Sequence, residues 1–425
     1  MVNSRAAIIG LDGVPYDLIT DLSSRDIMPY TGELLKEGKI TKARTSLPPN
    51  SAVSWSSIFT ARNPGEHGIF GFTDFLEDSY TVAYHHSMRL KAQPFWQKNH
   101  DKRTVIVNLP ATYPPQALNG VHISGFVSPQ LDRSIYPKEK AGLLEDSGYM
   151  VDVSAPFVES EIPTFLGELS KALENRVTVG KKLLQDKWDI AFFVITGTDR
   201  IGHYLWDAYR NKRNQYHGDF ISYFRKVDEA IHGITEELPE DTALMMLSDH
   251  GMTTSGTAFN LNTLLKEEGY LVVDEKPEIN YNAVKKPTKA FASETNKIYL
   301  NLESKFPRGS VKASDRIELK DEIKDLLTSV RLGGRRVVKS VYTREEIFDG
   351  PYSSSSPELV VLPEDGFSFK TGLFSKQLTS VDRLQGRHTE DDAFLYLKGV
   401  DSMDEFTHLE SALLALRTQY GGLNL

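Results

Sequence analysis

The stretch Ala6–Gly13, AAIIGLDG, places a continuous apolar run directly before an aspartate and a glycine. A strand that is buried on both faces loses the alternation of polar and apolar residues, so this run predicts a central strand of a sheet. Similar runs recur along the chain at Thr104–Leu109, Ile190–Ile195, Ala243–Leu247 and Glu358–Leu362. Residues 165–177 and 220–234 lie between such runs and have apolar residues at helical spacing. The alternation predicts an α/β fold, with a mostly parallel central sheet and helices on both faces.

The chain has 425 residues, which is enough for more than one lobe. The amino-acid composition changes between residues 255 and 380, where Lys and Glu become more frequent. We therefore expect a catalytic core formed by residues 1–254 and 381–425. Residues 255–380 would be an inserted cap that shapes the substrate pocket.

Composition excludes several classes of protein and site. Lys and Arg number 49 against 58 Asp and Glu, so the net charge is 49 − 58 = −9, which disfavours binding to extended nucleic acid. The chain has no cysteine, which removes disulfide frameworks, cysteine-ligated metals and cysteine nucleophiles. No apolar run is long enough to cross a membrane, and the first run is too short for the core of a signal peptide. We expect a cytoplasmic protein without a membrane partner.

Carboxylates follow three of the predicted strands. Asp12 follows the first strand, and Asp199 follows the run Ile190–Ile195, with His203 four residues further on. Asp249 and His250 follow the run Ala243–Leu247. Ligands of open α/β sheets bind beyond the carboxyl ends of the strands. A lone aspartate there is usually a cap or turn residue, but three of them accompanied by histidines indicate a metal site.

A third histidine, His388, follows the predicted cap and precedes the apolar run Ala393–Leu397. Carboxylates and imidazoles suit zinc, manganese or iron. Three of each exceed what one tetrahedral ion needs, so the set favours two ions, as in phosphoryl-transfer enzymes.

A candidate nucleophile lies in residues 47–57, LPPNSAVSWSS, which contain several hydroxyl groups. The prolines favour an extended approach to a helix, so Ser51 would lie near a helix N-terminus, where an anion is favoured. Ser51 alone could simply be an N-cap, and Ser54 lies three residues along the same predicted helix. The metal constellation favours Ser51 as a nucleophile, because a cation makes a hydroxyl easier to deprotonate.

Taken together, the motifs resemble those of the type I phosphodiesterase / nucleotide pyrophosphatase family of the alkaline phosphatase superfamily. The matching stretches are Ile9–Gly13, Pro48–Ser51, Thr60, Asn63–Ile69, Asn108–Pro115, Asn119–Gly120, Thr198–His203, Ser248–Met252 and Gly386–His388. Each stretch is short, but their order along nearly the whole chain makes the resemblance specific.

The resemblance implies two divalent cations, usually zinc, with manganese as the alternative. The first would be held by Asp199, His203 and His388. The second would be held by Asp12, Ser51, Asp249 and His250. Counted back nine residues from Thr60, Ser51 takes the position of the family's nucleophile. It would form a phosphoserine with a small anionic phosphate ester.

Substrate choice stays open in the sequence. The family usually has a phosphate-binding asparagine shortly after the His-Gly-Ile motif, but this chain reads Phe70-Gly71-Phe72 there. Phosphodiesters and nucleotide-like pyrophosphates are the leading substrate class. A phosphomonoesterase on the same core and a non-catalytic metal-binding or ligand-binding homologue are the alternatives, and the sequence leaves the oligomeric state undetermined.

Overall fold

The computed structural model describes residues 4–274 and 281–425. It divides into two compact units. The first comprises residues 1–63, 86–252 and 388–425, and the second comprises residues 64–85 and 253–387. The second unit thus includes residues 64–85, which the sequence analysis assigned to the core. It also spans most of the expected cap, whose residues 275–280 lie outside the described part of the chain. The action of the cap on the substrate pocket stays a prediction.

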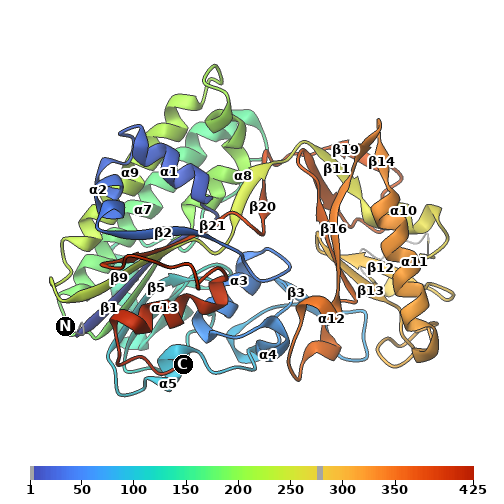
Figure 1. The fold of residues 1–425 in the computed structure, drawn as a ribbon, viewed down its shortest axis with the longest axis horizontal. Helices are drawn as coiled ribbons and strands as arrows, with labels where there is room; N and C mark the ends of the chain where they lie inside the picture. The colour runs from blue at the N-terminus through green and yellow to red at the C-terminus, as the bar shows by residue number, and fades with distance from the viewer. Residues whose placement is uncertain (1–3, 275–280) are drawn as a thin grey trace. The chain divides into compact units, whose positions relative to one another are not determined.

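An eight-stranded sheet forms the centre of the first unit (Figure 1). In spatial order its strands are β2 (Gly38–Ala43), β21 (Ala393–Lys398), β9 (Thr242–Leu247), β1 (Arg5–Leu11), β8 (Ile190–Ile195), β5 (Thr104–Leu109), β6 (Gly120–Ser124) and β7 (Ile135–Tyr136). The strands from β9 to β6 are parallel, whereas β2, β21 and β7 pair antiparallel at the two sides. The predicted fold class, α/β with a mostly parallel central sheet, is confirmed.

Helices cover both faces of this sheet because successive residues of a strand point to opposite sides. In β1, Ala7, Ile9 and Leu11 enter one apolar core, and Ala6 and Ile8 enter the other. The first core is closed by α1 (Tyr16–Ser24), α2 (Pro29–Lys36), α7 (Ile162–Leu184), α8 (Gly197–Arg210) and α9 (His217–Thr235). The second is closed by α3 (Ser51–Thr60), α5 (Phe95–Lys98) and α13 (Ala412–Gln419).

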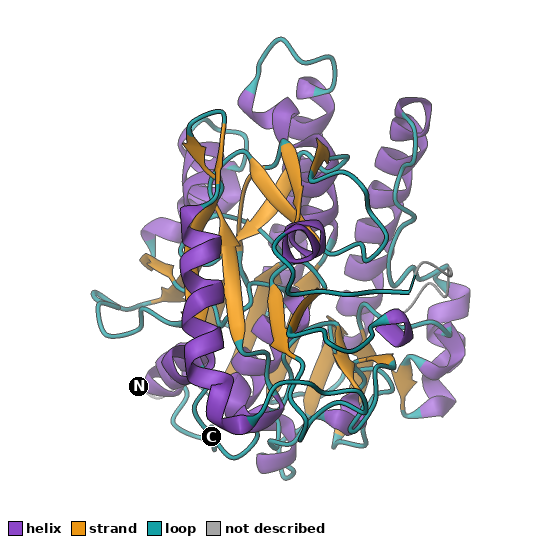
Figure 2. Ribbon diagram, turned by 90° about the vertical axis from the view of Figure 1, so that its right-hand side faces the viewer, coloured by secondary structure: helices purple, strands orange, loops and turns teal. Residues whose placement is uncertain are grey.

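The second unit has its own apolar core and smaller sheets; helices and strands are distinguished in Figure 2. Its largest sheet is antiparallel, with the order β12 (Ala290–Ser293), β13 (Lys297–Leu300), β17 (Leu359–Pro363) and β16 (Val338–Thr343). A three-stranded sheet consists of β18 (Phe367–Lys370), β11 (Thr257–Asn260) and β19 (Thr379–Val381), and the longest helix is α11 (Arg316–Ser329).

One predicted strand was assigned to the wrong sheet. The run Glu358–Leu362 does form a strand, β17, but it belongs to the antiparallel sheet of the second unit and not to the central sheet. A short, fully apolar run indicates burial on both faces, and it does not reveal which sheet buries it. None of the helices in the described residues is both long enough and apolar enough to cross a lipid bilayer.

His122 of β6 predicts an acid sensitivity of the first unit. Neither ring nitrogen has a hydrogen-bond partner among the described residues, the ring lies edge-on to Trp96, and burial lowers the pKa of His122 to about 3. Below about pH 6.5 the unfolded chain therefore binds a proton at this histidine that the folded chain does not bind. The free energy of unfolding consequently decreases as the pH is lowered. In His122→Leu, the free energy of unfolding should fall less steeply as the pH is lowered below about 6.5. The slope of the variant should be smaller than that of the wild type by about 1.4 kcal/mol per pH unit.

Urea unfolding at a series of pH values measures this slope. His100→Leu, which changes an exposed histidine of the same unit, is the control and should keep the wild-type slope. Equal slopes for His122→Leu and the wild type would contradict the assignment.

Candidate active site

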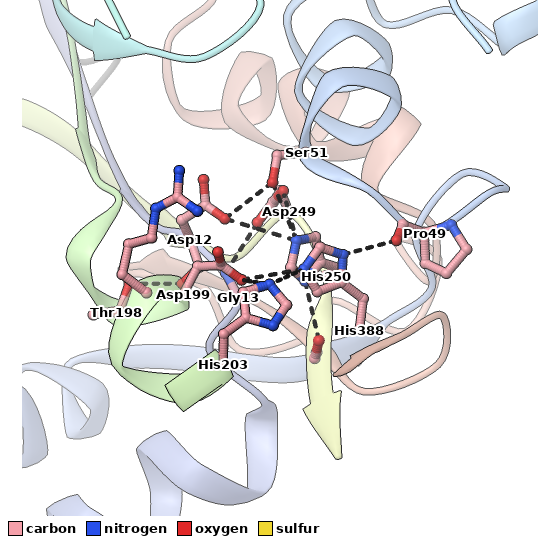
Figure 3. A network of polar contacts seen from close by, with 12 residues as sticks. Asp12, Gly13, Pro49, Ser51, Thr198, Asp199, His203, Asp249, His250 and His388 are labelled. Atoms are coloured by element: carbon pink, nitrogen blue, oxygen red, sulfur yellow. Dashed lines mark hydrogen bonds and ion pairs between the residues drawn. The ribbon is translucent and has the colours of Figure 1, made fainter. Parts of the chain in front are cut away.

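Three neighbouring parallel strands deliver the predicted carboxylates to one place. The strands β9, β1 and β8 are adjacent in the sheet. Asp12 directly follows β1, Asp249 lies two residues beyond β9, and Asp199 lies in the first turn of α8, after β8. All three carboxylates are buried. Figure 3 shows their side chains directed toward one another and toward the histidines.

Ser51 is the first residue of α3 and is buried beside Asp12. Its hydroxyl donates to Asp12 Oδ1 at 3.2 Å and lies 3.3 Å from His250 Nε2. Asn50 is the N-cap of the helix, because its side chain accepts a hydrogen bond from the Val53 amide at 3.1 Å. Capping therefore does not account for the Ser51 hydroxyl, which faces the carboxylates instead.

Asp199, His203 and His388 form one cluster of ligand atoms. The Nε2 atoms of the two histidines are 2.9 Å apart, and Asp199 Oδ1 lies 3.3 Å from that of His203 and 3.2 Å from that of His388. His388 Nδ1 donates to the Pro49 carbonyl at 2.9 Å, and this bond orients the ring so that Nε2 is the atom that faces Asp199 and His203. Asp199 and His203 reach the same place because they stand four residues apart on α8.

Asp12, Asp249 and His250 surround Ser51 on its other side. His250 Nδ1 donates to the Gly251 carbonyl at 3.0 Å. Its Nε2 lies 3.3 Å from Asp249 Oδ2 and 3.7 Å from Asp12 Oδ1. The other oxygen of Asp249, Oδ1, accepts the Gly13 amide at 3.1 Å. Ligand atoms of Asp12, Asp199 and His250 lie within 4.8 Å of one another, so Asp199 borders both clusters.

The electrostatics of the site reflect burial and crowding of like charges. Burial, aided by the charges of Asp249 and Asp199, raises the pKa of Asp12 well above its ordinary value. Burial likewise raises the pKa of Asp249 to about 7. Burial also acts to raise the pKa of Asp199, but the imidazoles of His203 and His388 outweigh it, and the net shift is downward. Burial lowers the pKa of His250, which therefore stays neutral.

These residues fit divalent cations. Asp199 Oδ1 and Asp249 Oδ2 are buried and accept no hydrogen bond from the described residues. A buried carboxylate oxygen without a donor costs free energy unless a positive charge faces it. Neutral imidazole nitrogens and carboxylate oxygens are also the ligands that zinc and manganese take in proteins. The six other residues expected from the sequence thus lie in one site with Ser51, in an arrangement able to hold cations.

A residue that the sequence analysis did not single out supports the start of α8. Arg200 follows Asp199, and its guanidinium pairs with both carboxylate oxygens of Asp152. The same guanidinium lies 4.6 Å from the centre of the Phe126 ring. Asp152 is 48 residues away along the chain, so no local sequence signal predicts this pairing. This pairing restrains the turn that carries Asp199.

A family model supplies the deciding comparison. The model for type I phosphodiesterase / nucleotide pyrophosphatase matches residues 6–389. The chain belongs to this family.

Individual relatives are distant. The catalytic subunit of human GPI ethanolamine phosphate transferase 3 is 33% identical over 70 residues, which are 16% of this chain, and the chain spans 6% of the length of that relative. Phosphonoacetate hydrolase from Sinorhizobium meliloti 1021, solved with phosphonoacetate, is similar with a TM-score of 0.68 at 17% identity, over 99% of this chain and 96% of that chain. Murine ectonucleotide pyrophosphatase / phosphodiesterase 5 has a TM-score of 0.59 at 16% identity, over 99% and 95% of the two chains. At these identities the solved structures support the fold.

The geometry separates Ser51 from Ser54. Thr45 Oγ1 donates to Ser54 Oγ at 2.7 Å, so this second hydroxyl serves a buried hydrogen bond. Ser54→Ala should lower the free energy of unfolding by about 1–3 kcal/mol, because it leaves the Thr45 hydroxyl unpaired, and should keep turnover within about twofold. Thermal melts and steady-state kinetics measure the two effects. Ser56→Ala is the matched control on the same helix. Ser56 Oγ is buried and has no hydrogen-bond partner in the part of the chain that the structure describes, so its loss should be nearly neutral.

Proposed function

We propose that this protein cleaves phosphodiester or nucleotide-like pyrophosphate bonds through a covalent phosphoserine at Ser51, with the help of two divalent cations. The observation that carries the proposal is the position of the Ser51 hydroxyl, at the start of α3 and between Asp12 and His250. A helix N-terminus favours an anion, so a phosphate group in front of Ser51 would meet a favourable field.

The first step would join Ser51 to phosphorus. The bond from Ser51 Oγ to phosphorus forms, the bond from phosphorus to the leaving oxygen breaks, and the leaving group takes that electron pair. The hydrogen bond from Ser51 to Asp12 Oδ1 orients the hydroxyl and makes this carboxylate the acceptor of its proton. In the second step, the oxygen of a water molecule forms a bond to phosphorus and the bond from phosphorus to Ser51 Oγ breaks. A proton of that water goes to Ser51 Oγ, and the proton on Asp12 is released.

Two groups of ligands would hold the cations. Asp199, His203 and His388 would hold the first, and the second would be held by Asp12, Ser51, Asp249 and His250. When bound, the cations stabilise the negative charge on the attacking and leaving oxygens of an in-line displacement. Zinc is the cation that the donor set favours, and manganese is the alternative.

The proposed substrate is a small phosphate ester. In support, murine ectonucleotide pyrophosphatase / phosphodiesterase 5 has been solved with AMP, which is a phosphate ester. The Sinorhizobium enzyme has been solved with phosphonoacetate, a small anion that has a carbon–phosphorus bond instead of an ester. The decisive assay compares p-nitrophenyl phosphate, bis-p-nitrophenyl phosphate and a p-nitrophenyl nucleotide ester, with the metal stripped and restored. We expect kcat/KM to be at least about tenfold higher for the diesters, a difference of about 1.4 kcal/mol in transition-state binding. A preference for the monoester would instead make the protein a phosphomonoesterase.

Ser51→Ala should lower kcat at least about 1000-fold and abolish any phosphoenzyme, because it removes the proposed nucleophile. The fold should survive with a change in stability of about 1 kcal/mol. Peptide mapping of an acid-quenched reaction should find phosphate on Ser51 of the wild type. Phosphate on another residue, or full activity of the variant, would contradict the covalent step.

Metal content tests the two groups of ligands separately. The zinc-loaded wild type should contain two ions per chain by elemental analysis. His388→Ala should lose the first ion, and Asp249→Asn the second, because each removes a ligand from one group only. His100→Ala, which changes an exposed histidine, should retain both ions. A wild type with fewer than two ions, or a single variant that loses both, would contradict this division of the ligands.

A further inference from the structure

One carboxylate of the site, Asp12, is bound by α3 through both of its oxygens. Ser51 Oγ donates to Oδ1 at 3.2 Å, and the indole nitrogen of Trp55 donates to Oδ2 at 3.1 Å. Ser51 and Trp55 stand four residues apart on α3, so they lie on the same face of the helix. The helix that carries the hydroxyl therefore also carries the group that orients the carboxylate next to it.

The indole of Trp55 occupies a closely fitted slot. Its side chain is fully buried and packs edge-on against Phe192 of β8, with the ring centres 5.9 Å apart. A Cβ atom on Gly10 of β1 would lie only 2.4 Å from Trp55 Cη2. The strand that Asp12 follows thus has a glycine where the indole lies. The close packing of the indole on this glycine fixes the direction of the N–H group. An indole nitrogen only donates, so its bond to a carboxylate oxygen is one-directional.

We propose that Trp55 is a positioning residue for Asp12. By occupying Oδ2, its N–H turns Oδ1 toward Ser51 and His250, and so presents Asp12 to the second cation through a single oxygen. Without the indole, the carboxylate could rotate and lose its alignment with the hydroxyl. This inference deepens the proposed function, because it assigns the support of one cation ligand at the same site.

Trp55→Phe tests the proposal, because it keeps an aromatic ring in the slot but replaces the indole by a smaller ring that has no N–H donor. The matched control is Trp96→Phe. Trp96 is buried in the same apolar core and packs on Phe59 of α3, with the ring centres 5.1 Å apart. Its indole nitrogen has no hydrogen-bond partner among the described residues. A purely structural effect of losing an indole from this core should appear in both variants.

The first measurement is a titration with zinc or cobalt in the His388→Ala background, in which the second cation is the one expected to remain. Trp55→Phe should weaken this binding about 10- to 100-fold, and Trp96→Phe should leave it within about twofold. In the otherwise wild-type enzyme, Trp55→Phe should lower kcat about tenfold with KM unchanged. Equal behaviour of the two tryptophan variants would overturn the proposal.

A second measurement uses the intact chain and does not depend on the folding of a variant. Its 4 tryptophans give separate indole N–H resonances in a nitrogen-15 spectrum. Addition of zinc should shift the Trp55 resonance, and the Trp96 resonance should stay in place; an unmoved Trp55 signal would overturn the assignment. Failure of the proposed function has a different signature, because a Ser51→Ala enzyme that still turns over would contradict the phosphoserine without changing either measurement on Trp55.

Discussion

Three buried carboxylates within one small site impose the constraint on which the rest of this structure depends. Asp12, Asp199 and Asp249 cannot all carry charge away from water unless positive charge lies among them. The raised pKa values of Asp12 and Asp249 express this conflict, whereas at Asp199 the histidine imidazoles outweigh the effect of burial. Divalent cations would resolve it, and the same charge would prepare the site for an anionic phosphate ester.

The order of the strands brings these carboxylates together. Because β9, β1 and β8 are parallel neighbours, their carboxyl ends meet, and each delivers one carboxylate. The start of α3 adds Ser51 beside this edge, and the return of the chain after the second unit adds His388. Rigid strands and helix ends thus hold ligands that lie up to 376 residues apart along the chain, from Asp12 to His388.

Much of this arrangement could be predicted from the sequence, because buried strands and the polar residues after them are local signals. The bounds of β5 and β8 were predicted, and the candidate ligands were those that the structure gathers. Other features depend on contacts between distant segments, such as the indole of Trp55 on Asp12, Asp152 on Arg200, and β17 in the second unit. No local pattern encodes those pairings. The cytoplasmic location stays a prediction.

The central claim is that two cations share the edge of the sheet around Ser51. Anomalous diffraction at the zinc absorption edge, from crystals of the zinc-loaded protein, tests it most directly. We expect two peaks, one among Asp199, His203 and His388, and the other next to Ser51 Oγ with Asp12, Asp249 and His250. A single peak, or peaks remote from these residues, would contradict it.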